Sequence, residues 1–372
     1  MPFPSAEKAI PEFAGWRWTS VKNAAVQALK FSVAAGVLVY LYVRGDIAWE
    51  PLRTALQHWQ YSVPAFLLLT LMPLAQFWRW QCLLRASHLH LPHREVFSYL
   101  MVSKFFNTAL PGYISGDVIR GFYVFRRASK GGMGQPLEEA NSKAEPSRGK
   151  PSAGKPSAVV ASIVFDRTAG LIPLFLLCLI GLLGSLDKPL PGPVVAAVGS
   201  ITGAGLLLPL GLFLWTYRRP QPAPFLLRLS RWIRLDRSLA ALYQDAHQYV
   251  RDWKLIGNIL GLSFLNQGLA IASFTLSGFA LQMQTPLMSY LLLVPLGLLV
   301  TAIPLSPAGL GVGQVAFLAL FHLAGTAQGA NLFTLYMASY VLINLAGALL
   351  YLFPRLGAPR PQPASAPKIQ TE

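Results

Sequence analysis

Residues 104–120, KFFNTALPGYISGDVIR, and residues 301–314, TAIPLSPAGLGVGQ, decide the fold that this chain is predicted to adopt. Each stretch lies in a hydrophobic segment and is interrupted by proline and glycine where a helix in a bilayer would continue. In hydrocarbon every unpaired backbone N–H or C=O is costly, so such breaks survive only where protein buries them or where they line a cavity. One break in each half of a chain is the pattern expected of a binding site between two internal repeats.

The composition is that of a membrane protein. Hydrophobic residues make up 53% of the 372 residues and charged residues only 12%. Several apolar runs approach the roughly 20 residues that cross a hydrocarbon core about 30 Å thick. We therefore predict an all-α polytopic membrane protein with about six full spans and two broken, re-entrant helices. The spans are expected near residues 24–43, 61–78, 159–183, 193–216, 255–280 and 331–353, and the broken segments at 97–120 and 287–330.

The positive charge of the chain is explained by membrane topology. The net charge is +16, and 25 of the 31 lysines and arginines fall at the two termini or in the segments 79–96, 120–158 and 217–254. Loops rich in lysine and arginine stay in the cytoplasm, so both termini are predicted to be cytoplasmic. With the charge accounted for in this way, nucleic acid is not expected as a partner.

This distribution of charge also predicts an inverted repeat. For segments 120–158 and 217–254 both to be cytoplasmic, the first broken segment must enter and leave on the cytoplasmic side and the second on the outer side. The halves, about 20–185 and 190–353, then have opposite orientations. In an alternative topology, each broken segment crosses the membrane twice as two short helices. The termini remain cytoplasmic, but the tip of each hairpin then lies on the opposite side of the membrane.

Three segments are expected outside the membrane domain. Residues 128–158 are rich in glycine, proline, serine and lysine, which predicts a disordered cytoplasmic insertion. Residues 222–252 combine apolar and basic positions at helical spacing, which predicts an amphipathic cytoplasmic helix that lies on anionic lipid or packs against the ends of the spans. Residues 354–372 are expected to form a disordered cytoplasmic tail.

Ionisable residues inside the hydrophobic segments are few, so each is a candidate for function. They are Lys104, Asp117, Arg120, Asp166 and Arg167. Adjacent helical residues point about 100° apart, so Asp166 and Arg167 are expected to form separate pairs with the 104–120 hairpin. Free backbone N–H groups, a positive helix end and basic side chains would suit an anion such as a lipid phosphate. The alternative is that these ion pairs only hold the hairpin in place.

The second break carries no charge. Its prolines and glycines allow close approach of the backbone, Ser306 could cap a helix, and Gln314 offers an amide. We predict no catalytic or metal-binding residue and no cofactor. The predicted substrate-binding residues are Lys104, Asn107, Pro111, Gly116, Asp117, Arg120, Asp166, Arg167, Ser306, Pro307, Gly309, Gly311 and Gln314.

Three motifs in this order carry a resemblance to a known family. The runs 105–120, 164–171 (VFDRTAGL) and 304–314 resemble the flippase-like integral membrane family that includes the transmembrane domain of lysylphosphatidylglycerol synthase. The likeness covers about residues 20–353. It implies a bacterial inner-membrane protein with two re-entrant segments that moves or handles lipids or lipid-linked molecules. It also matches the first motif to Gly116, Asp117 and Arg120, the second to Asp166 and Arg167, and the third to Pro307, Gly309 and Gly311.

Two departures from the family limit what the resemblance implies. The third motif usually ends in an acidic residue, where this chain has Gln314, so no proton or cation role is expected there. The synthase carries a soluble aminoacyl-transferring domain after its spans, whereas this chain stops about 19 residues after its last predicted span. It is therefore not expected to make lysyl-lipid by itself.

The function favoured by these observations is translocation of a phospholipid or lipid-linked molecule, without enzymatic chemistry. One alternative is a membrane transferase that acts on a lipid-linked substrate, for which Asp117 and Asp166 are the acids available in the membrane. A further alternative is a scaffold for envelope-synthesis enzymes that docks through residues 128–158. A metal site at His88, His90 and His93 is a minor possibility, because the histidines lie in a short loop that contains Pro92. The oligomeric state is not predicted.

Overall fold

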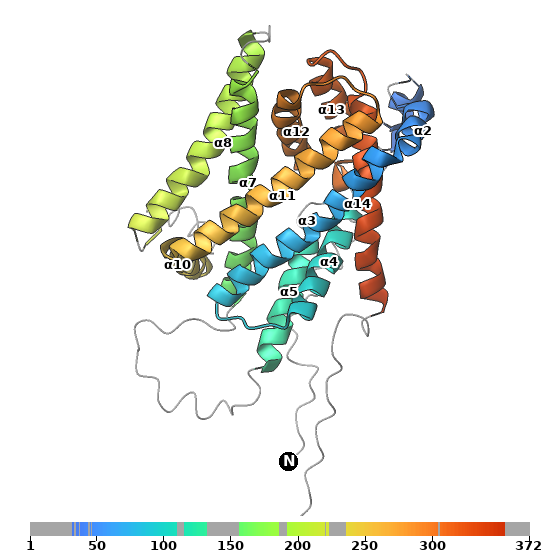
Figure 1. Ribbon diagram of the computed structural model, residues 1–372. Coiled ribbons are helices and arrows are strands. Elements are labelled where there is room, and N and C mark those ends of the chain that lie inside the picture. Colours follow the sequence, from blue (N-terminus) through green and yellow to red (C-terminus); the bar gives the residue numbers. More distant parts are fainter. Residues whose placement is uncertain are drawn as a thin grey trace, which may run out of the picture.

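A computed structural model of the chain describes residues 47–109, 115–131, 156–185, 192–219, 221–222, 236–303 and 306–353, with scattered positions between 32 and 45. The regular elements of this described part are all helices, joined by turns and loops, and it contains no strand (Figure 1). The predicted all-α membrane fold is confirmed. Most of the first predicted span, 24–43, and all of the predicted tail, 354–372, lie outside the described residues.

Five of the described helices are long and apolar enough to cross a membrane. They are α3 (Trp59–Ala86), α7 (Pro156–Leu183), α8 (Gly192–Arg218), α11 (Trp253–Ala280) and α14 (Gly329–Leu352). Several contain an internal proline, which membrane helices tolerate because neighbouring groups satisfy the freed backbone carbonyls. Each of them overlaps one of the predicted spans, and α3 extends eight residues beyond the predicted end at residue 78.

The two broken segments are pairs of shorter helices. The first consists of α4 (His93–Ala109) and α5 (Ser115–Gly131). The second consists of α12 (Leu287–Thr301), the 3-10 turn η3 (Pro307–Gly309) and α13 (Val312–His322), and within its turn Ala308 and Gly309 both have positive φ. Figure 1 shows α4 and α5 in the lower half of the molecule and α12 and α13 in the upper half.

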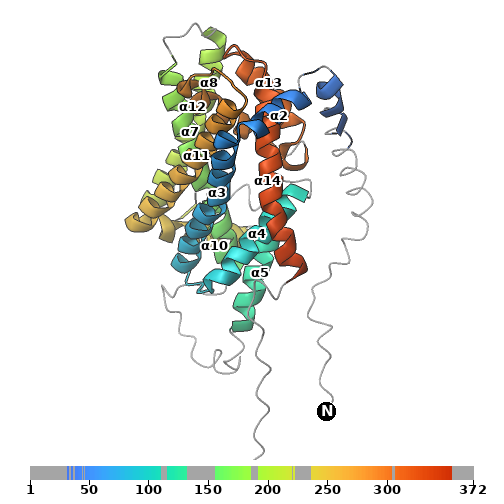
Figure 2. The ribbon, with the colours of Figure 1, turned by 45° about the vertical axis from the view of Figure 1, so that its right-hand side comes forward.

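Long helices of the two halves form the frame between these segments. α3 and α11 pack along their length, α4 packs against α14, and α12 packs against α7 (Figures 1 and 2). Glycines permit the last two contacts: a Cβ on Gly347 would lie 2.1 Å from the Met101 carbonyl oxygen, and one on Gly181 would lie 2.4 Å from the Leu292 nitrogen. Small residues let membrane helices approach closely, and van der Waals packing then holds them together.

Aromatic side chains fill the core beside the second broken segment. Phe274 of α11 stacks on Phe317 of α13 and on Tyr336 of α14, with ring centroids 5.1 and 4.4 Å apart. Phe317 also stacks on Phe321 and contacts Phe333. Ring pairs of this kind contribute about 0.5–1.5 kcal/mol beyond the area they bury. This cluster fixes α13 to α11 and α14 of the frame.

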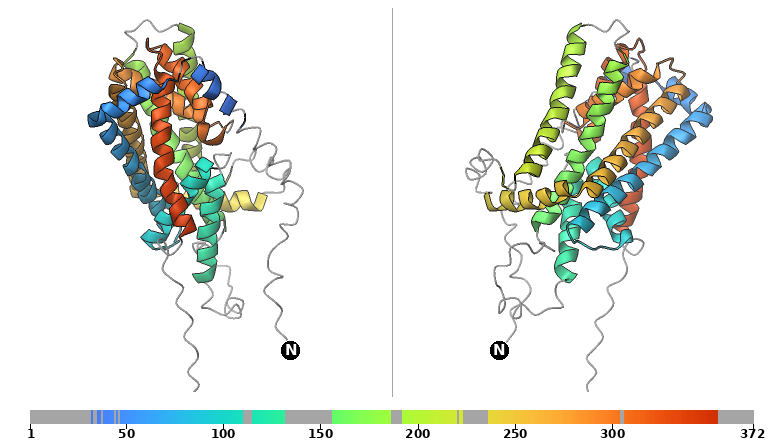
Figure 3. Two further views of the ribbon diagram at one scale, coloured as in Figure 1. Left: turned by 90° about the vertical axis from the view of Figure 1, so that its right-hand side faces the viewer. Right: turned by 60° about the vertical axis from the view of Figure 1, so that its left-hand side comes forward.

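The cytoplasmic segments predicted from the sequence differ from the structure at their ends. The predicted insertion 128–158 is too long at both ends, because α5 continues to Gly131 and α7 begins at Pro156. These helices extend into the polar segment because each residue added to an existing helix gains a backbone hydrogen bond. Of the predicted helix 222–252, the structure describes α10 (Asp236–Arg251), which packs against α7 and α8 across their lower ends (Figure 3). The remaining residues of both segments are not described, apart from the non-helical residues 222 and 252.

Candidate functional site

A cavity of about 340 Å³ lies where the two broken segments approach each other. Its polar lining comes mainly from α3, α4, α5, α7 and α11, with Thr301 of α12, and its other lining residues include members of α12, η3 and α14. η3 itself packs against α4. The polar and charged lining residues are Gln76, Arg79, Ser103, Lys104, Asn107, Asp117, Arg120, Asp166, Arg167, Asn266, Gln267 and Thr301.

Asp166 of α7 is one of the two carboxylates that line this cavity. Its Oδ1 accepts a hydrogen bond from Arg79 Nε of α3 at 2.6 Å, and its Oδ2 accepts one from Arg120 Nη2 of α5 at 3.1 Å. Arg79 also donates to Ser263 of α11 through Nη1 at 3.0 Å. All three charged side chains are buried. The carboxylate therefore joins α3, α5 and α7, and Arg79 links them to α11.

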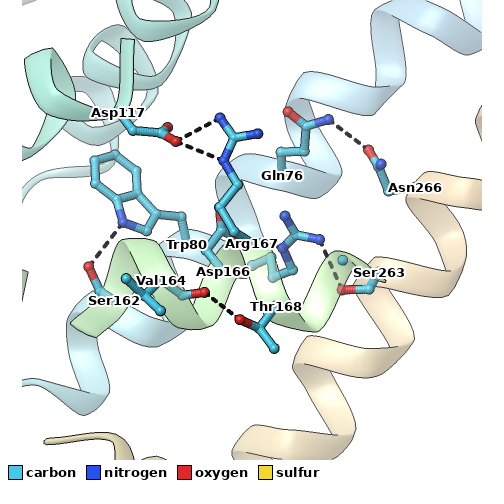
Figure 4. A network of polar contacts seen from close by, with 12 residues as sticks. Gln76, Trp80, Asp117, Ser162, Val164, Asp166, Arg167, Thr168, Ser263 and Asn266 are labelled. Carbon is cyan, nitrogen blue, oxygen red and sulfur yellow. Dashed lines mark hydrogen bonds and ion pairs between the residues drawn. The ribbon is translucent and has the colours of Figure 1, made fainter. Parts of the chain in front are cut away.

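Asp117, in the first turn of α5, forms the second group of ion pairs. Arg167 of α7 donates to Asp117 Oδ2 through Nε at 2.7 Å (Figure 4). Arg120 Nε lies 3.0 Å from Asp117 Oδ1. Arg120 thus lies between the two carboxylates, and its guanidinium also stacks over the Trp80 ring at 4.7 Å. The prediction that Asp166 and Arg167 pair separately with the hairpin is confirmed.

Lys104 extends the polar lining toward α11 and α14. Its Nζ donates to Gln76 Oε1 at 2.9 Å, and Gln76 Nε2 donates to Asn266 Oδ1 at 3.0 Å (Figure 4). The same Nζ lies 5.4 Å from the centroid of the Tyr340 ring. Amides and an aromatic face therefore surround this ammonium group on the cavity wall.

The lining carries an excess of positive charge. Four basic side chains and two carboxylates line the cavity, which leaves a formal charge of +2. Each carboxylate contacts two arginines, so neither presents an uncompensated negative charge. Interactions between charges are stronger in a low-dielectric interior than in water, and a phosphate placed here would meet charge-assisted donors. The arrangement suits an anion.

The second broken segment contributes shape to the cavity. Thr301, Ala302 and Ala308 line it, whereas Ser306, Gly309, Gly311 and Gln314 are absent from the lining. Gln314 Oε1 accepts from the Gly311 backbone N–H at 2.7 Å and so caps α13. The expected capping role thus belongs to Gln314 instead of Ser306, because α13 begins only at Val312.

The structure brings together part of the residues predicted to bind substrate. Lys104, Asn107, Asp117, Arg120, Asp166 and Arg167 line one cavity. Gly116 lies at the contact between α4 and α5, where its N–H donates to Asn107 Oδ1 at 2.8 Å. Pro111 lies outside the described residues, and nothing is described of the side chain of Pro307.

Arg79 is the functional candidate that the sequence analysis missed. The predicted span ended at residue 78, which placed Arg79 in a cytoplasmic loop, but α3 continues to Ala86 and buries Arg79 beside Asp166. The apolar and aromatic residues that follow it, from Trp80 to Leu84, are the signal that could have extended the span. Gln76 and Gln267 of the lining were likewise not among the predicted site residues.

No group of three histidines, cysteines or acidic residues suitable for a metal ion occurs in the described part of the chain. His93 of the cluster considered above lies 3.0 Å from Arg85 Nη2 through its Nε2. His90 Nδ1 lies 3.2 Å from the backbone oxygen of His88.

Comparison with known families gives one match. The model of the lysylphosphatidylglycerol synthase TM region matches residues 27–347, which is most of the chain and includes every residue of the cavity. Comparisons with curated proteins and with solved structures gave no match.

Proposed function

The chain belongs to the lysylphosphatidylglycerol synthase TM region family, and from this premise we propose that it moves a lipid or lipid-linked molecule with an anionic headgroup across the membrane. The observation that carries the proposal is the formal charge of +2 on a buried cavity where two broken helical segments meet. A phosphate would bind there to arginine and lysine donors, while its apolar chains stay in the bilayer.

The lengths of the helices support a re-entrant arrangement. At a rise of about 1.5 Å per residue, the 11 residues of α13 extend roughly 16 Å and the 15 residues of α12 roughly 22 Å, less than a hydrocarbon core of about 30 Å. We infer that α12 and α13 enter and leave on the outer side, that α4 and α5 do so on the cytoplasmic side, and that the halves are inverted. Both termini are then cytoplasmic, and the proposed location is the bacterial inner membrane.

Alternating access to the cavity would follow from this arrangement. One hairpin approaches from each side of the membrane and both reach the same cavity, so the movement of either would expose the bound headgroup to that side. No nucleotide-binding signature of the type G-x-x-x-x-G-K-[ST] occurs in the sequence. Translocation is therefore proposed to be passive or coupled to an ion.

The transferase alternative needs a base or nucleophile at the cavity. Each carboxylate there contacts two arginines, which occupy its oxygens. The geometry therefore favours binding and movement of the headgroup over chemistry on it.

The test is translocation of fluorescent phosphatidylglycerol in proteoliposomes by the wild type, by Lys104→Gln and by Lys254→Gln. Lys254 is an exposed lysine at the start of α11, so its substitution removes the same charge away from the cavity. Hydrogen bonds to charged groups contribute about 1.5–3 kcal/mol, which corresponds to a loss of about tenfold or more for Lys104→Gln and none for Lys254→Gln. Equal rates for the two variants, or a covalently altered lipid in the product analysis, would contradict the proposal.

A further inference from the structure

The outer faces of α5 and α7 carry two neighbouring apolar stripes. On α5 the exposed residues are Val118, Phe122 and Phe125, and on α7 they are Val160, Val164 and Leu171. Their spacing of three, four or seven residues places each set on one side of its helix. Both helices also carry the charged residues of the cavity, Asp117 and Arg120 on α5 and Asp166 and Arg167 on α7.

The two stripes border the line along which α5 contacts α7. A Cβ on Gly121 would lie 3.1 Å from Ile163 Cδ1 and 3.8 Å from Val159 Cγ1, so Gly121 marks this contact on α5. Val118 and Phe122 follow Asp117 and Gly121 by one position in the sequence. Because successive helical residues point about 100° apart, both side chains lie to one side of the contact. On α7, Val164 follows Ile163 in the same way. We call this line, with its two apolar stripes, the α5–α7 seam.

Arg167 is the charged residue of the cavity that reaches the seam. Its side chain is 36% exposed, whereas those of Asp117, Arg120 and Asp166 are 7%, 3% and 6% exposed. Along α7 it lies between Val164 and Leu171 of the exposed stripe, yet it donates to Asp117 at the cavity wall. A basic group therefore stands between the lipid-facing surface and the buried charges.

We propose that the α5–α7 seam is a lateral binding site for the acyl chains of an anionic bilayer lipid, whose phosphate meets Arg167 before it reaches Arg120 and Lys104. This inference rests on the proposed function, because it names the route by which a lipid enters the same cavity. The chains lie against the apolar stripes, and the headgroup passes from bilayer to cavity without leaving the protein surface. A zwitterionic headgroup carries the same phosphate beside a positive charge, so it gains less from Arg167 than a headgroup with net negative charge does.

Exposed apolar residues alone would not identify such a site, because every lipid-facing helix has them. α8 supplies the matched comparison: Leu207 and Leu208 are 72% and 74% exposed, and neither they nor any other residue of α8 lines the charged cavity. The seam differs from this surface in one respect, the partly exposed arginine that continues into the cavity. That difference is what the experiment must measure.

The experiment is photocrosslinking to lipid in proteoliposomes. Cysteine is introduced singly at Val118, Val164 or Leu207 in a Cys82→Ser, Cys178→Ala background of the full chain and labelled with benzophenone maleimide. The vesicles contain radiolabelled phosphatidylglycerol, or radiolabelled phosphatidylcholine with the same chains, in excess unlabelled phosphatidylcholine. At positions 118 and 164 we expect at least three times as much crosslinking to phosphatidylglycerol as to phosphatidylcholine. At position 207 we expect no such enrichment of phosphatidylglycerol. We expect Arg167→Gln to remove the enrichment at positions 118 and 164.

Equal labelling by the two lipids at all three positions would overturn the proposal, and so would enrichment that survives Arg167→Gln. Failure here is distinguishable from failure of the proposed function. If phosphatidylglycerol is enriched at the seam but the protein translocates no lipid, the binding site is supported and the proposed transport function is wrong. If translocation depends on the headgroup but no lipid is enriched at the seam, the transport function is supported and entry through the seam is wrong.

Discussion

The carboxylate of Asp166 accepts from Arg79 of α3 and from Arg120 of α5, so three helices meet at one buried negative charge. Removal of one partner from a buried ion pair leaves the other charges uncompensated and costs about 3–5 kcal/mol. Arg120 has two roles in this network, because it pairs with Asp166 and is also a proposed ligand of the headgroup.

We therefore expect Asp166→Asn to lower the stability of the protein by about 3–5 kcal/mol, on the grounds that Arg79 and Arg120 lose their shared counter-charge. The measurement is the midpoint of thermal unfolding of the purified protein in detergent. Asp252→Asn is the matched control, since Asp252 caps α11 by accepting from Leu255 N and asparagine caps equally well. Identical midpoints for the two variants would show that Asp166 does not hold the helices together.

The residues of this network were only partly predictable. Asp117, Arg120, Asp166 and Arg167 stand out in the sequence because ionisable residues are rare in apolar segments. Arg79 does not, because it lies near the end of an apolar run and its counter-charge comes from a residue 87 positions later. Only the packing of α3 against α7 shows that Arg79 is inside the protein.

At the scale of elements, the first broken segment depends on the close contact between α4 and α5. A Cβ on Gly116 would lie 1.9 Å from the Ser103 backbone oxygen, whereas a Cβ on Gly121 would meet the flexible end of Ile163 at 3.1 Å. Backbone cannot move aside without separating the helices, but a side-chain tip can change its rotamer.

This difference predicts that Gly116→Ala disrupts the hairpin and that Gly121→Ala does not. Overpacking costs about 1–3 kcal/mol, and occasionally more, so Gly116→Ala should lower the unfolding midpoint and the amount of protein in the membrane. Gly121→Ala is the control for the loss of glycine in the same helix. Similar behaviour of both variants would contradict the packing seen between α4 and α5.

α13 begins with a cap that explains why glutamine is sufficient at position 314. Gln314 Oε1 accepts from the N–H of Gly311, whose φ of 79° suits glycine. Gln314 is buried, and its Nε2 donates to Thr334 Oγ1 at 3.5 Å. A glutamate in its neutral, protonated form would offer the same acceptor and an O–H donor in place of this N–H, so we expect Gln314→Glu to preserve stability and translocation. Gln314→Ala removes the cap and should cost about 0.5–2 kcal/mol.

Thermal unfolding and phosphatidylglycerol translocation of the two variants test this role. Loss of translocation in Gln314→Glu with an unchanged unfolding midpoint would indicate that position 314 acts on the substrate instead of on the helix. The sequence predicted where both segments break, because proline and glycine mark the breaks directly. It did not predict that Gly116 and Gln314 support the helices instead of lining the cavity, because this depends on contacts with other parts of the chain.

At the scale of the whole molecule, the account depends on how the hairpins sit in the membrane. If α4 and α5 are re-entrant from the cytoplasmic side, Ser115 at their tip is protected from the outside. Gln284 and Ala327, at the two ends of the second segment, are then both external. The alternative with two thin crossings places Ser115 at the outer surface.

Single cysteines at these positions, in a cysteine-free background, distinguish the two topologies. We expect a membrane-impermeant maleimide added outside intact cells to label Gln284→Cys and Ala327→Cys but not Ser115→Cys. His90→Cys, between α3 and α4, is the control and should react only after the membrane is made permeable. Labelling of Ser115→Cys from outside at the rate of Gln284→Cys would favour the two crossings.

The arrangement of the whole molecule was predictable only in outline. Hydropathy located the five long apolar helices, because apolar length depends on local composition. Their orientation, inferred from the distribution of charge, stays a prediction. The packing of α3 along α11 and the aromatic cluster around Phe317 were not foreseen, because helix contacts in a membrane depend on side-chain shape. The cavity is a product of those contacts.

The most direct test of the central claim is the ratio of two translocation rates in wild-type proteoliposomes. Phosphatidylglycerol and phosphatidylcholine with identical acyl chains are followed in the same vesicles, at equal density of protein. A cavity with a formal charge of +2 predicts faster movement of the anionic lipid, by about tenfold for each 1.4 kcal/mol of additional binding that is retained in the rate-limiting step. Equal rates for the two lipids would contradict the claim that this cavity selects an anionic headgroup.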